Sequence, residues 1–329
     1  MKALIYDGPE VLRYGDAPDP VAKNGEQLIR IEAVGICGSD MHAYLGHDAR
    51  RTATLILGHE AAGVIVGGKQ DGTRVTINPL VTCGDCEACV SGQTNLCPKR
   101  EIISMPPREG GFSQMVAMPH GNLVEVPDDV SFAQASLAEP ISCGWHTARL
   151  CRRAVPRGRT ALVIGGGAVG LGAALSLAAQ GVLDVKIVEP NTMRADYLRD
   201  VCGQNVLSPD DLAEGGTFDI VIDGVGYAAT RATASAQVKA GGVIGHIGLG
   251  EDSGGLDVRR MTLQEITFIG TYTYTAQDFR DTAAAMFDGR LGDLKWTETR
   301  PLSQGAQAFA DIRGGVVAAP KIVFLPQDG

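Results

Sequence analysis

The sequence predicts an α/β protein built from a doubly wound parallel sheet and an irregular, mostly antiparallel β-barrel. Three observations support this fold class. Short strand-like runs fill the first 130 residues, a strand-then-helix rhythm begins at Arg159, and a Gly-rich turn follows the first strand of that rhythm. Alternating strands and helices are typical of a parallel sheet covered by helices. The 329 residues suffice for about two domains.

The barrel is predicted from short apolar runs that Gly, Pro, Asn and Asp interrupt. The clearest expected strands are 27–34, 62–66, 73–77 and 123–126. A helix is expected to begin after Pro140 and to continue to Cys151.

The parallel sheet is predicted from the part of the chain that follows Arg159. Its expected strands are 160–165, 185–189, 218–223, 242–247 and 266–270, with helices at 167–179 and 192–201. Further helices are expected at 277–287 and 304–311, before a last strand at 321–325.

Composition argues against several classes of partner. The net charge of −9, without a basic stripe, makes nucleic acid and anionic membranes poor candidates. The apolar stretch 161–179 is long enough for a membrane span, but its many glycines indicate a strand, a turn and a packed helix instead. The N-terminus has no signal-peptide layout, so we expect a cytoplasmic protein whose clustered cysteines bind metal rather than form disulfides.

The Gly-rich turn has the dinucleotide-binding pattern G-x-G-x-x-G, with glycines at Gly165, Gly167 and Gly170. Such a turn lets a pyrophosphate approach the backbone at a helix N-terminus, as in Rossmann domains. Glu189 ends the next strand about twenty residues later, where a carboxylate binds the adenosine ribose and repels a 2′-phosphate. NAD is therefore favoured, although Arg194 nearby could attract the phosphate of NADP.

Four cysteines follow the pattern C-x₂-C-x₂-C-x₇-C at Cys83, Cys86, Cys89 and Cys97. Four thiolates complete a tetrahedral zinc shell with no open position, which is typical of a structural site. Ferredoxin-like iron–sulfur segments share the first part of the pattern, but their last gap is shorter, so zinc is favoured.

A second metal site is suggested by scattered polar residues. The segments 35–42, 58–60 and 138–140 offer Cys37, His59, Glu60 and Glu139 as possible ligands, although any one of them alone is usually structural. A catalytic zinc site takes three protein ligands and keeps one open position. Sequence spacing alone does not bring these residues together.

Taken with these motifs and their order, the chain resembles the zinc-containing medium-chain dehydrogenase/reductase superfamily, and most closely its sorbitol (polyol) dehydrogenase branch. The resemblance extends over nearly the whole chain and includes 35–40, 58–60, the cysteine run, 110–113, 138–140, 165–170 and 321–323. It implies a GroES-like catalytic domain with the structural zinc lobe at 1–142, a Rossmann NAD-binding domain at 143–271, and a return to the catalytic domain at 272–329.

The resemblance also implies residue roles at the catalytic zinc. Cys37 and His59 match zinc ligands, and Glu60 and Glu139 match two carboxylates near the metal. One carboxylate is expected to bind the ion directly and the other to hold a water molecule; which does which stays open. The four clustered cysteines match the structural zinc lobe.

Further matches concern proton transfer and the cofactor. Ser39 matches the hydroxyl that begins a proton relay, and His42 matches its outer end. The positions that match NAD contacts are Gly165, Gly167, Ala168, Val169, Gly170, Glu189, Arg194, Ile247, Gly248 and Leu249.

The implied activity is the oxidation of a secondary alcohol, a small polyol or sugar alcohol, to a ketone, with NAD as hydride acceptor and zinc lowering the pKa of the substrate hydroxyl. Ala43 and Thr273 depart from the sorbitol dehydrogenase pattern, which has an aromatic residue and an Arg there. Threonine or simple-alcohol dehydrogenases of the same superfamily, or a non-catalytic NAD-binding protein, are the alternatives. The family suggests a homodimer or homotetramer.

Several residue roles have plainer alternatives. The Ser39 hydroxyl could simply cap a loop, and His42 could simply be a surface residue. Arg50 and Arg51 could recognise a phosphorylated sugar alcohol, but a solvated loop is the preferred interpretation.

Overall fold

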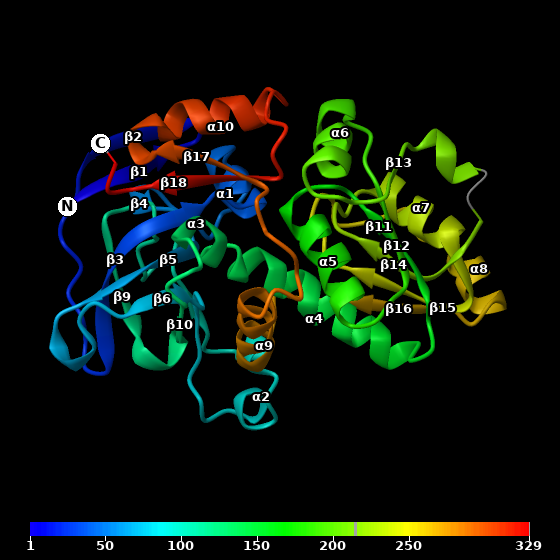
Figure 1. Cartoon of the computed structure of the whole chain (residues 1–329), viewed down its shortest axis with the longest axis horizontal. Coiled ribbons are helices and arrows are strands. Elements are labelled where there is room, and N and C mark those ends of the chain that lie inside the picture. The colour runs from blue at the N-terminus through cyan, green and yellow to red at the C-terminus, as the bar shows by residue number, and fades with distance from the viewer. Residues whose placement is uncertain (214–215, 329) are drawn as a thin grey trace. The chain divides into compact units, whose positions relative to one another are not determined.

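The computed structural model describes residues 1–213 and 216–328 and divides the chain into two units (Figure 1). The first unit contains Met1–Glu139, Thr275–Phe287 and Thr297–Gly329, and the second contains Pro140–Tyr274 and Asp288–Trp296. The sequence-based domain bounds stay a proposal; they differ from these units chiefly at Asp288–Trp296, which belongs to the second unit.

The first unit is mostly antiparallel. Its largest sheet has the order β10-β6-β5-β3-β18-β17, and β9 also pairs with β3. These strands are β3 (Glu26–Gly35), β5 (Glu60–Val66), β6 (Arg74–Ile77), β9 (Met115–Pro119), β10 (Leu123–Glu125), β17 (Thr297–Pro301) and β18 (Lys321–Leu325). Two small sheets accompany it, formed by β1 (Lys2–Gly8), β2 (Val11–Asp16) and β4 (Leu55–Ile56), and by β7 (Leu80–Val81) and β8 (Glu101–Ile102).

Short helices connect these strands. They are α1 (Gly38–Tyr44), α2 (Glu87–Val90), α3 (Phe132–Ala135), α9 (Ala276–Phe287) and α10 (Gly305–Arg313), with 3₁₀ turns η1 (Gly68–Gln70), η2 (Thr94–Leu96), η3 (His120–Asn122) and η5 (Leu302–Gln304). Aromatic rings fill part of the core: the Phe112 ring centroid lies 5.3 Å from Phe324 and 6.1 Å from Phe309, which also contacts Tyr44.

The second unit is a parallel sheet of order β13-β12-β11-β14-β15-β16. Its strands are β11 (Thr160–Ile164), β12 (Asp184–Val188), β13 (Val206–Leu207), β14 (Phe218–Asp223), β15 (Val238–His246) and β16 (Thr267–Gly270). The chain moves outward from β11 in one direction and then from β14 in the other, which is the doubly wound order. The predicted fold class is confirmed.

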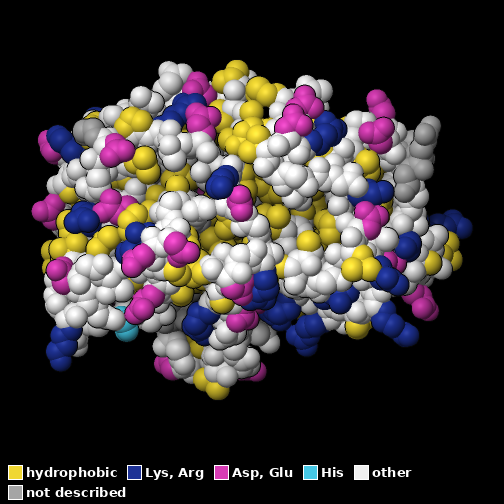
Figure 2. Space-filling view, in the orientation of Figure 1, with side chains coloured by type: hydrophobic (Ala, Val, Ile, Leu, Met, Phe, Trp, Pro, Cys, Tyr) yellow, Lys and Arg dark blue, Asp and Glu magenta, His cyan; other side chains and the backbone are white. Residues whose placement is uncertain are grey.

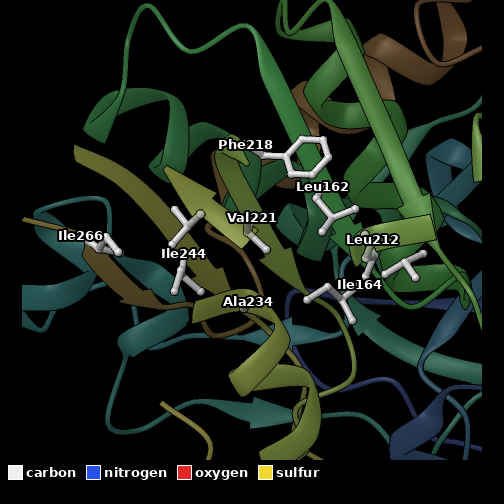
Figure 3. Close-up of a cluster of buried hydrophobic side chains, with 10 residues drawn as sticks. Leu162, Ile164, Leu212, Phe218, Val221, Ala234, Ile244 and Ile266 are labelled. Atoms are coloured by element: carbon white, nitrogen blue, oxygen red, sulfur yellow. The ribbon is translucent and has the colours of Figure 1, made fainter. Parts of the chain in front are cut away.

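Helices cover this sheet, with α5 and α7 on either side of it in Figure 1. They are α4 (Ala138–Ala154), α5 (Ala168–Ala179), α6 (Thr192–Asp200), α7 (Ala228–Gln237) and α8 (Val258–Leu263), with η4 (Asp210–Ala213). One buried cluster lies between strands and helices and includes Leu162, Phe218, Val221, Ala234 and Ile244 (Figure 3).

Two expected element starts were wrong by three residues or more. Strand β15 begins at Val238 rather than at 242, because Val238 also pairs with Phe218 of β14. Helix α4 begins at Ala138, two residues before Pro140, rather than after it. Proline is tolerated there because the first N–H groups of a helix have no intrahelical acceptor. The stretch 161–179 forms β11, the glycine turn and α5, and no helix in the described ranges is long and apolar enough to cross a bilayer.

Charged side chains of both signs are mixed on the surface. On the face drawn in Figure 2, acidic side chains lie among the basic ones. This agrees with the net charge of −9 and gives no support to a nucleic-acid surface on that face.

We predict that Gly144→Ala destabilises the protein although Ala is the better helix former by about 0.8–1.0 kcal/mol. Gly144 lies in α4, and a Cβ there would overlap the backbone of Ala173 in α5. Overpacking of this kind costs about 1–3 kcal/mol in free energy of unfolding, measurable by urea titration. Gly121→Ala is the control because its Cβ would enter open space. Equal stability of both variants would contradict the close approach of α4 and α5.

Candidate functional site

Antiparallel pairing of β3 with β5 brings three potential metal ligands together. The register places Gly35, the last residue of β3, opposite Glu60, the first residue of β5. Cys37 follows two residues after Gly35, and His59 comes immediately before Glu60. The ligand atoms of Cys37, His59 and Glu60 consequently lie within 4.8 Å of one another.

Two glycines make this arrangement sterically possible. A Cβ on Gly35 would overlap Oε2 of Glu60, so the pairing position opposite the carboxylate needs a residue without a side chain. Gly58 has φ of +90°, and a Cβ there would overlap the ring of Phe112. Glycine adopts this left-handed backbone at no steric cost, which lets the chain turn into His59.

Asp40 forms hydrogen bonds with both segments that carry the ligands, the one with Cys37 and the one with His59. It is fully buried near the start of α1, and its Oδ2 accepts a hydrogen bond of 3.0 Å from the backbone N of Cys37. Its Oδ1 accepts from the N of Gly58 at 3.3 Å and lies 3.5 Å from Nδ1 of His59. Burial raises the pKa of Asp40, but the charge of His59 and the hydrogen bonds outweigh it and lower that pKa.

The His59 ring has two partners at Nδ1. Ser104 Oγ lies 3.2 Å from this nitrogen, and Asp40 Oδ1 lies 3.5 Å from it. Burial lowers the pKa of His59, whereas Asp40 and Cys37 raise it well above its ordinary value. Partners at Nδ1 are typical of a histidine that binds metal through Nε2, because they fix the tautomer and the ring orientation.

Lys321 supplies a buried cation beside Glu60. Its Nζ donates to Glu60 Oε1 at 2.6 Å and to the carbonyl of Ile36 at 2.7 Å. Burial lowers the pKa of Lys321, but Glu60, Cys37 and, less strongly, Glu139 raise it. The motif 321–323 gives no sign in the sequence of this ion pair, because the pair joins residues that lie 261 positions apart.

Glu139 is the second carboxylate that the sequence predicts near the catalytic metal. It is buried, and its charge contributes to raising the pKa of Lys321. Within the described part of the chain, however, it is outside the group of mutually close ligand atoms that Cys37, His59 and Glu60 form.

The second group of ligands is the cysteine lobe around α2 and η2. The four Sγ atoms of Cys83, Cys86, Cys89 and Cys97 lie within 4.8 Å of one another. Cys83 Sγ is 3.9 Å from Cys89 Sγ and 3.5 Å from Cys97 Sγ. Tetrahedral zinc with bonds of about 2.3 Å requires thiolates about 3.8 Å apart. The spacing fits one ion; thiolates around an iron–sulfur cluster bind different irons and would be spread more widely.

The chemistry of the donor sets also fits zinc. A closed set of four cysteines is a structural zinc set, and a Cys, His and carboxylate set with one remaining position is a catalytic one. Within the lobe, the backbone of Cys83 lowers the pKa of Cys97 to about 7, whereas Asp85 raises that of Cys83 to about 12. Metal binding needs the thiolate form of each cysteine.

The two predicted relay residues lie on α1. Ser39 is half-buried and His42 is exposed, and their spacing of three places them on neighbouring positions of the helix surface. Ser39 Oγ lies 3.4 Å from a terminal nitrogen of Arg51. The ring centroids of His42 and His47 lie 6.3 Å apart.

The glycine turn lies at the carboxyl end of β11, next to β14, where the strand order reverses. Gly165 has φ of +96°, and a Cβ on Gly170 would overlap the carbonyl of Gly165. Gly167 precedes Ala168, the first residue of α5. The turn therefore presents a helix N-terminus at the switch point, where nucleotides bind in such sheets.

Glu189 is held rigidly beside this turn. Its Oε2 accepts from the N of Gly166 at 2.8 Å, and its Oε1 accepts from the N of Asn191 at 2.9 Å. Each carboxylate oxygen keeps a second lone pair. Arg194 lies half-buried in the first turn of α6, whose N-terminus Asn191 caps.

The predicted loop after β15 is also at this end of the sheet. The N–H groups of Ile247 and Gly248 both donate to the carbonyl of Asp223, at 3.0 and 3.1 Å. Gly248 lies against the backbone of Gly226, so a Cβ on either residue would overlap the other segment. Leu249 is 77% exposed.

Comparison with known proteins gives the family. The alcohol dehydrogenase GroES-like domain matches residues 23–128, and the zinc-binding dehydrogenase domain matches residues 168–288. L-galactonate-5-dehydrogenase of Escherichia coli is 30% identical, with 94% of each chain covered. Sorbitol dehydrogenase of Bacillus subtilis is 32% identical, with 83% of this chain and 82% of the relative covered.

The chain belongs to the zinc-containing medium-chain dehydrogenases. A solved structure of an E. coli oxidoreductase/dehydrogenase of unknown specificity agrees, with 26% identity, a TM-score of 0.89 and 98% of each chain covered. The predicted family and enzyme class, a zinc- and nicotinamide-dependent alcohol dehydrogenase, are confirmed. The roles of individual residues in this medium-chain dehydrogenase remain predictions.

We predict that Lys321→Met destabilises the metal-free protein by about 3–5 kcal/mol, because it leaves the carboxylate of Glu60 buried without its cation. Lys321→Arg keeps the charge and should recover most of this loss. Denaturant unfolding in the presence of a chelator measures both values. A methionine variant as stable as the wild type would show that the pair does not hold the site together.

Proposed function

We propose that this medium-chain dehydrogenase oxidises a secondary alcohol, a small polyol or sugar alcohol, to the ketone with NAD as hydride acceptor. The observation that supports this most directly is the meeting of Cys37, His59 and Glu60 ligand atoms within 4.8 Å. The names of the relatives, an L-galactonate and a sorbitol dehydrogenase, agree with a polyhydroxylated substrate.

Cys37, His59 and Glu60 would hold the catalytic zinc, and Glu139 would supply the second carboxylate near it. Bound zinc lowers the pKa of the substrate hydroxyl, and bound nicotinamide accepts the hydride. The four cysteines of the lobe would hold a second, structural ion.

Ser39 and His42 would remove the substrate proton. Ser39 is half-buried and follows Cys37 by two residues, and its hydroxyl would accept the substrate proton while it donates its own. His42, exposed on the same helix, would release the proton to water.

The nucleotide would bind at the turn formed by Gly165, Gly167, Ala168, Val169 and Gly170, with Ile247, Gly248 and Leu249 beside the nicotinamide and Arg194 near the ribose. Glu189 would accept hydrogen bonds from the ribose hydroxyls and exclude the 2′-phosphate of NADP. Its rigid backbone contacts at Gly166 and Asn191 support this role.

Substrate preference beyond this class rests on few residues. Ala43 and Tyr44 are both buried, and Tyr44 packs on Phe309. Ala43 stands where the sorbitol dehydrogenase pattern has an aromatic residue. This departure favours testing threonine and simple secondary alcohols beside polyols.

We also propose a cytoplasmic homodimer or homotetramer. β16 is one of the two edge strands of its sheet and carries the partly exposed Phe268. An uncovered edge strand offers backbone groups to a second copy of the chain.

Cys37→Ala and His59→Ala should each reduce kcat by more than about 100-fold, because even outer-shell partners of a metal are worth 10–100-fold. Zinc content should fall from about two ions per chain to one. NADH absorbance over a panel of polyols, threonine and simple alcohols, together with metal analysis, measures both. Cys202→Ala, in the other unit, is the control. An unchanged rate with one zinc lost would refute the catalytic role.

Glu189→Gln should raise kcat/KM for NADP relative to NAD by about 10–100-fold, since the lost charge is worth about 1.5–3 kcal/mol in a charged hydrogen bond. Asp184→Asn makes the same change of charge at the other end of β12 and should leave the ratio unaltered. A ratio that stays constant in both variants would show that another group selects the cofactor.

A further inference from the structure

Arg51 is buried although its neighbour Arg50 is not. The Arg51 side chain is 1% exposed, whereas that of Arg50 is 64% exposed. Asp48 pairs with both guanidinium groups. A buried guanidinium is costly unless each of its N–H groups finds an acceptor, so the contacts of Arg51 can be counted.

Arg51 makes five polar contacts within the chain, one for each of its five N–H groups. Nε donates to the carbonyl of Ser104 at 2.9 Å. One terminal nitrogen donates to the carbonyl of Ser39 at 3.1 Å and to Asp48 Oδ2 at 2.9 Å. The other contacts Oγ of Ser39 at 3.4 Å and Oγ of Ser104 at 3.3 Å. With all five donors engaged within the chain, Arg51 has none left for a substrate phosphate, so that alternative is wrong for this residue. The preferred interpretation, a solvated loop, is also wrong for Arg51, whose side chain is 1% exposed.

The contacts with Ser39 hold the hydroxyl that the proposed function uses as a relay. Arg51 contacts both the backbone carbonyl and Oγ of Ser39. An N–H that donates to Oγ occupies one lone pair, so the hydroxyl hydrogen must point away from the guanidinium. The other lone pair remains to accept a proton, which is the orientation that a relay needs.

The contacts with Ser104 reach the predicted metal ligand His59. Ser104 has φ of +71°, a left-handed backbone that is unfavourable for a residue with a side chain. Such a conformation persists where the surroundings fix it, and Arg51 holds both its carbonyl and its hydroxyl. The same hydroxyl lies 3.2 Å from Nδ1 of His59.

We propose that Arg51 is a positioning residue that fixes the Ser39 hydroxyl and, through Ser104, the imidazole of His59. One buried guanidinium thereby sets the relay and the metal ligand relative to each other. The part of this inference that concerns Ser39 rests on the proposed function, because Ser39 acts as a relay only in that reaction. The part that concerns His59 is about how firmly the metal is held, which can be measured without any enzymatic reaction.

The test compares zinc-loaded Arg51→Met, Arg51→Lys and the control Arg50→Met. Zinc release to a colorimetric chelator reports His59, and kcat and KM for NAD report the relay. In Arg51→Met, one of the two zinc ions should leave about 10–100-fold faster, since outer-shell partners are worth that much in affinity. Its kcat should fall by a similar factor at unchanged KM for NAD. Arg51→Lys should recover part of both, and Arg50→Met should match the wild type.

Ser104→Ala separates the two halves and serves if Arg51→Met does not fold. It removes only the hydroxyl between Arg51 and His59, so zinc release should quicken while the contacts of Arg51 with Ser39 remain. Wild-type zinc release and kcat in a folded Arg51→Met, even with lower thermal stability, would overturn the proposal. Zinc release at the wild-type rate in Ser104→Ala would overturn the part of the proposal that concerns His59. A wild type that oxidises no alcohol would refute the proposed function, and the zinc-release comparison would still decide the role of Arg51.

Discussion

The pairing of Gly35 with Glu60 across β3 and β5 is the constraint on which the candidate catalytic site depends. A shift of register by one residue would exchange the two faces of the strand and separate the ligands. The register is fixed locally by the missing side chain of Gly35 and from outside the hairpin by Lys321, which binds both Glu60 and the carbonyl of Ile36. The C-terminal strand β18 thus closes a site whose ligands come from the N-terminal part of the chain.

Further polar groups near this strand pair hold the ligands in place. Asp40 joins the backbone of Cys37 to that of Gly58, and Asp40 and Ser104 hold the same nitrogen of His59. Ligands that are fixed before a metal arrives lose little conformational freedom on binding it. The cysteine lobe differs, because its four ligands come from one short segment and need no distant strand to meet. The two donor sets therefore suit a rigid catalytic centre and a local structural one.

The sequence predicted most of the fold because its signals are local. The rhythm of apolar strands, the glycine turn and the C-x₂-C-x₂-C-x₇-C spacing each lie within a short window, and the corresponding elements are in the structure. The start of α4 differs from the expectation because Pro140 lies within the first turn of the helix rather than before it. The roles of Lys321, Ser104 and Arg51 could not be predicted, because they come from contacts between distant segments. Asp40 was the exception that sequence could have found, three residues after Cys37 at a helix start.

Anomalous diffraction at the zinc absorption edge, from crystals of the zinc-loaded enzyme, would show whether Cys37 and His59 share a metal ion. Two peaks per chain are expected: one bonded to Cys37 Sγ and to Nε2 of His59, with a carboxylate nearby, and one at the centre of the four cysteine sulfurs. A single peak in the cysteine lobe, or a second peak away from Cys37 and His59, would contradict this expectation.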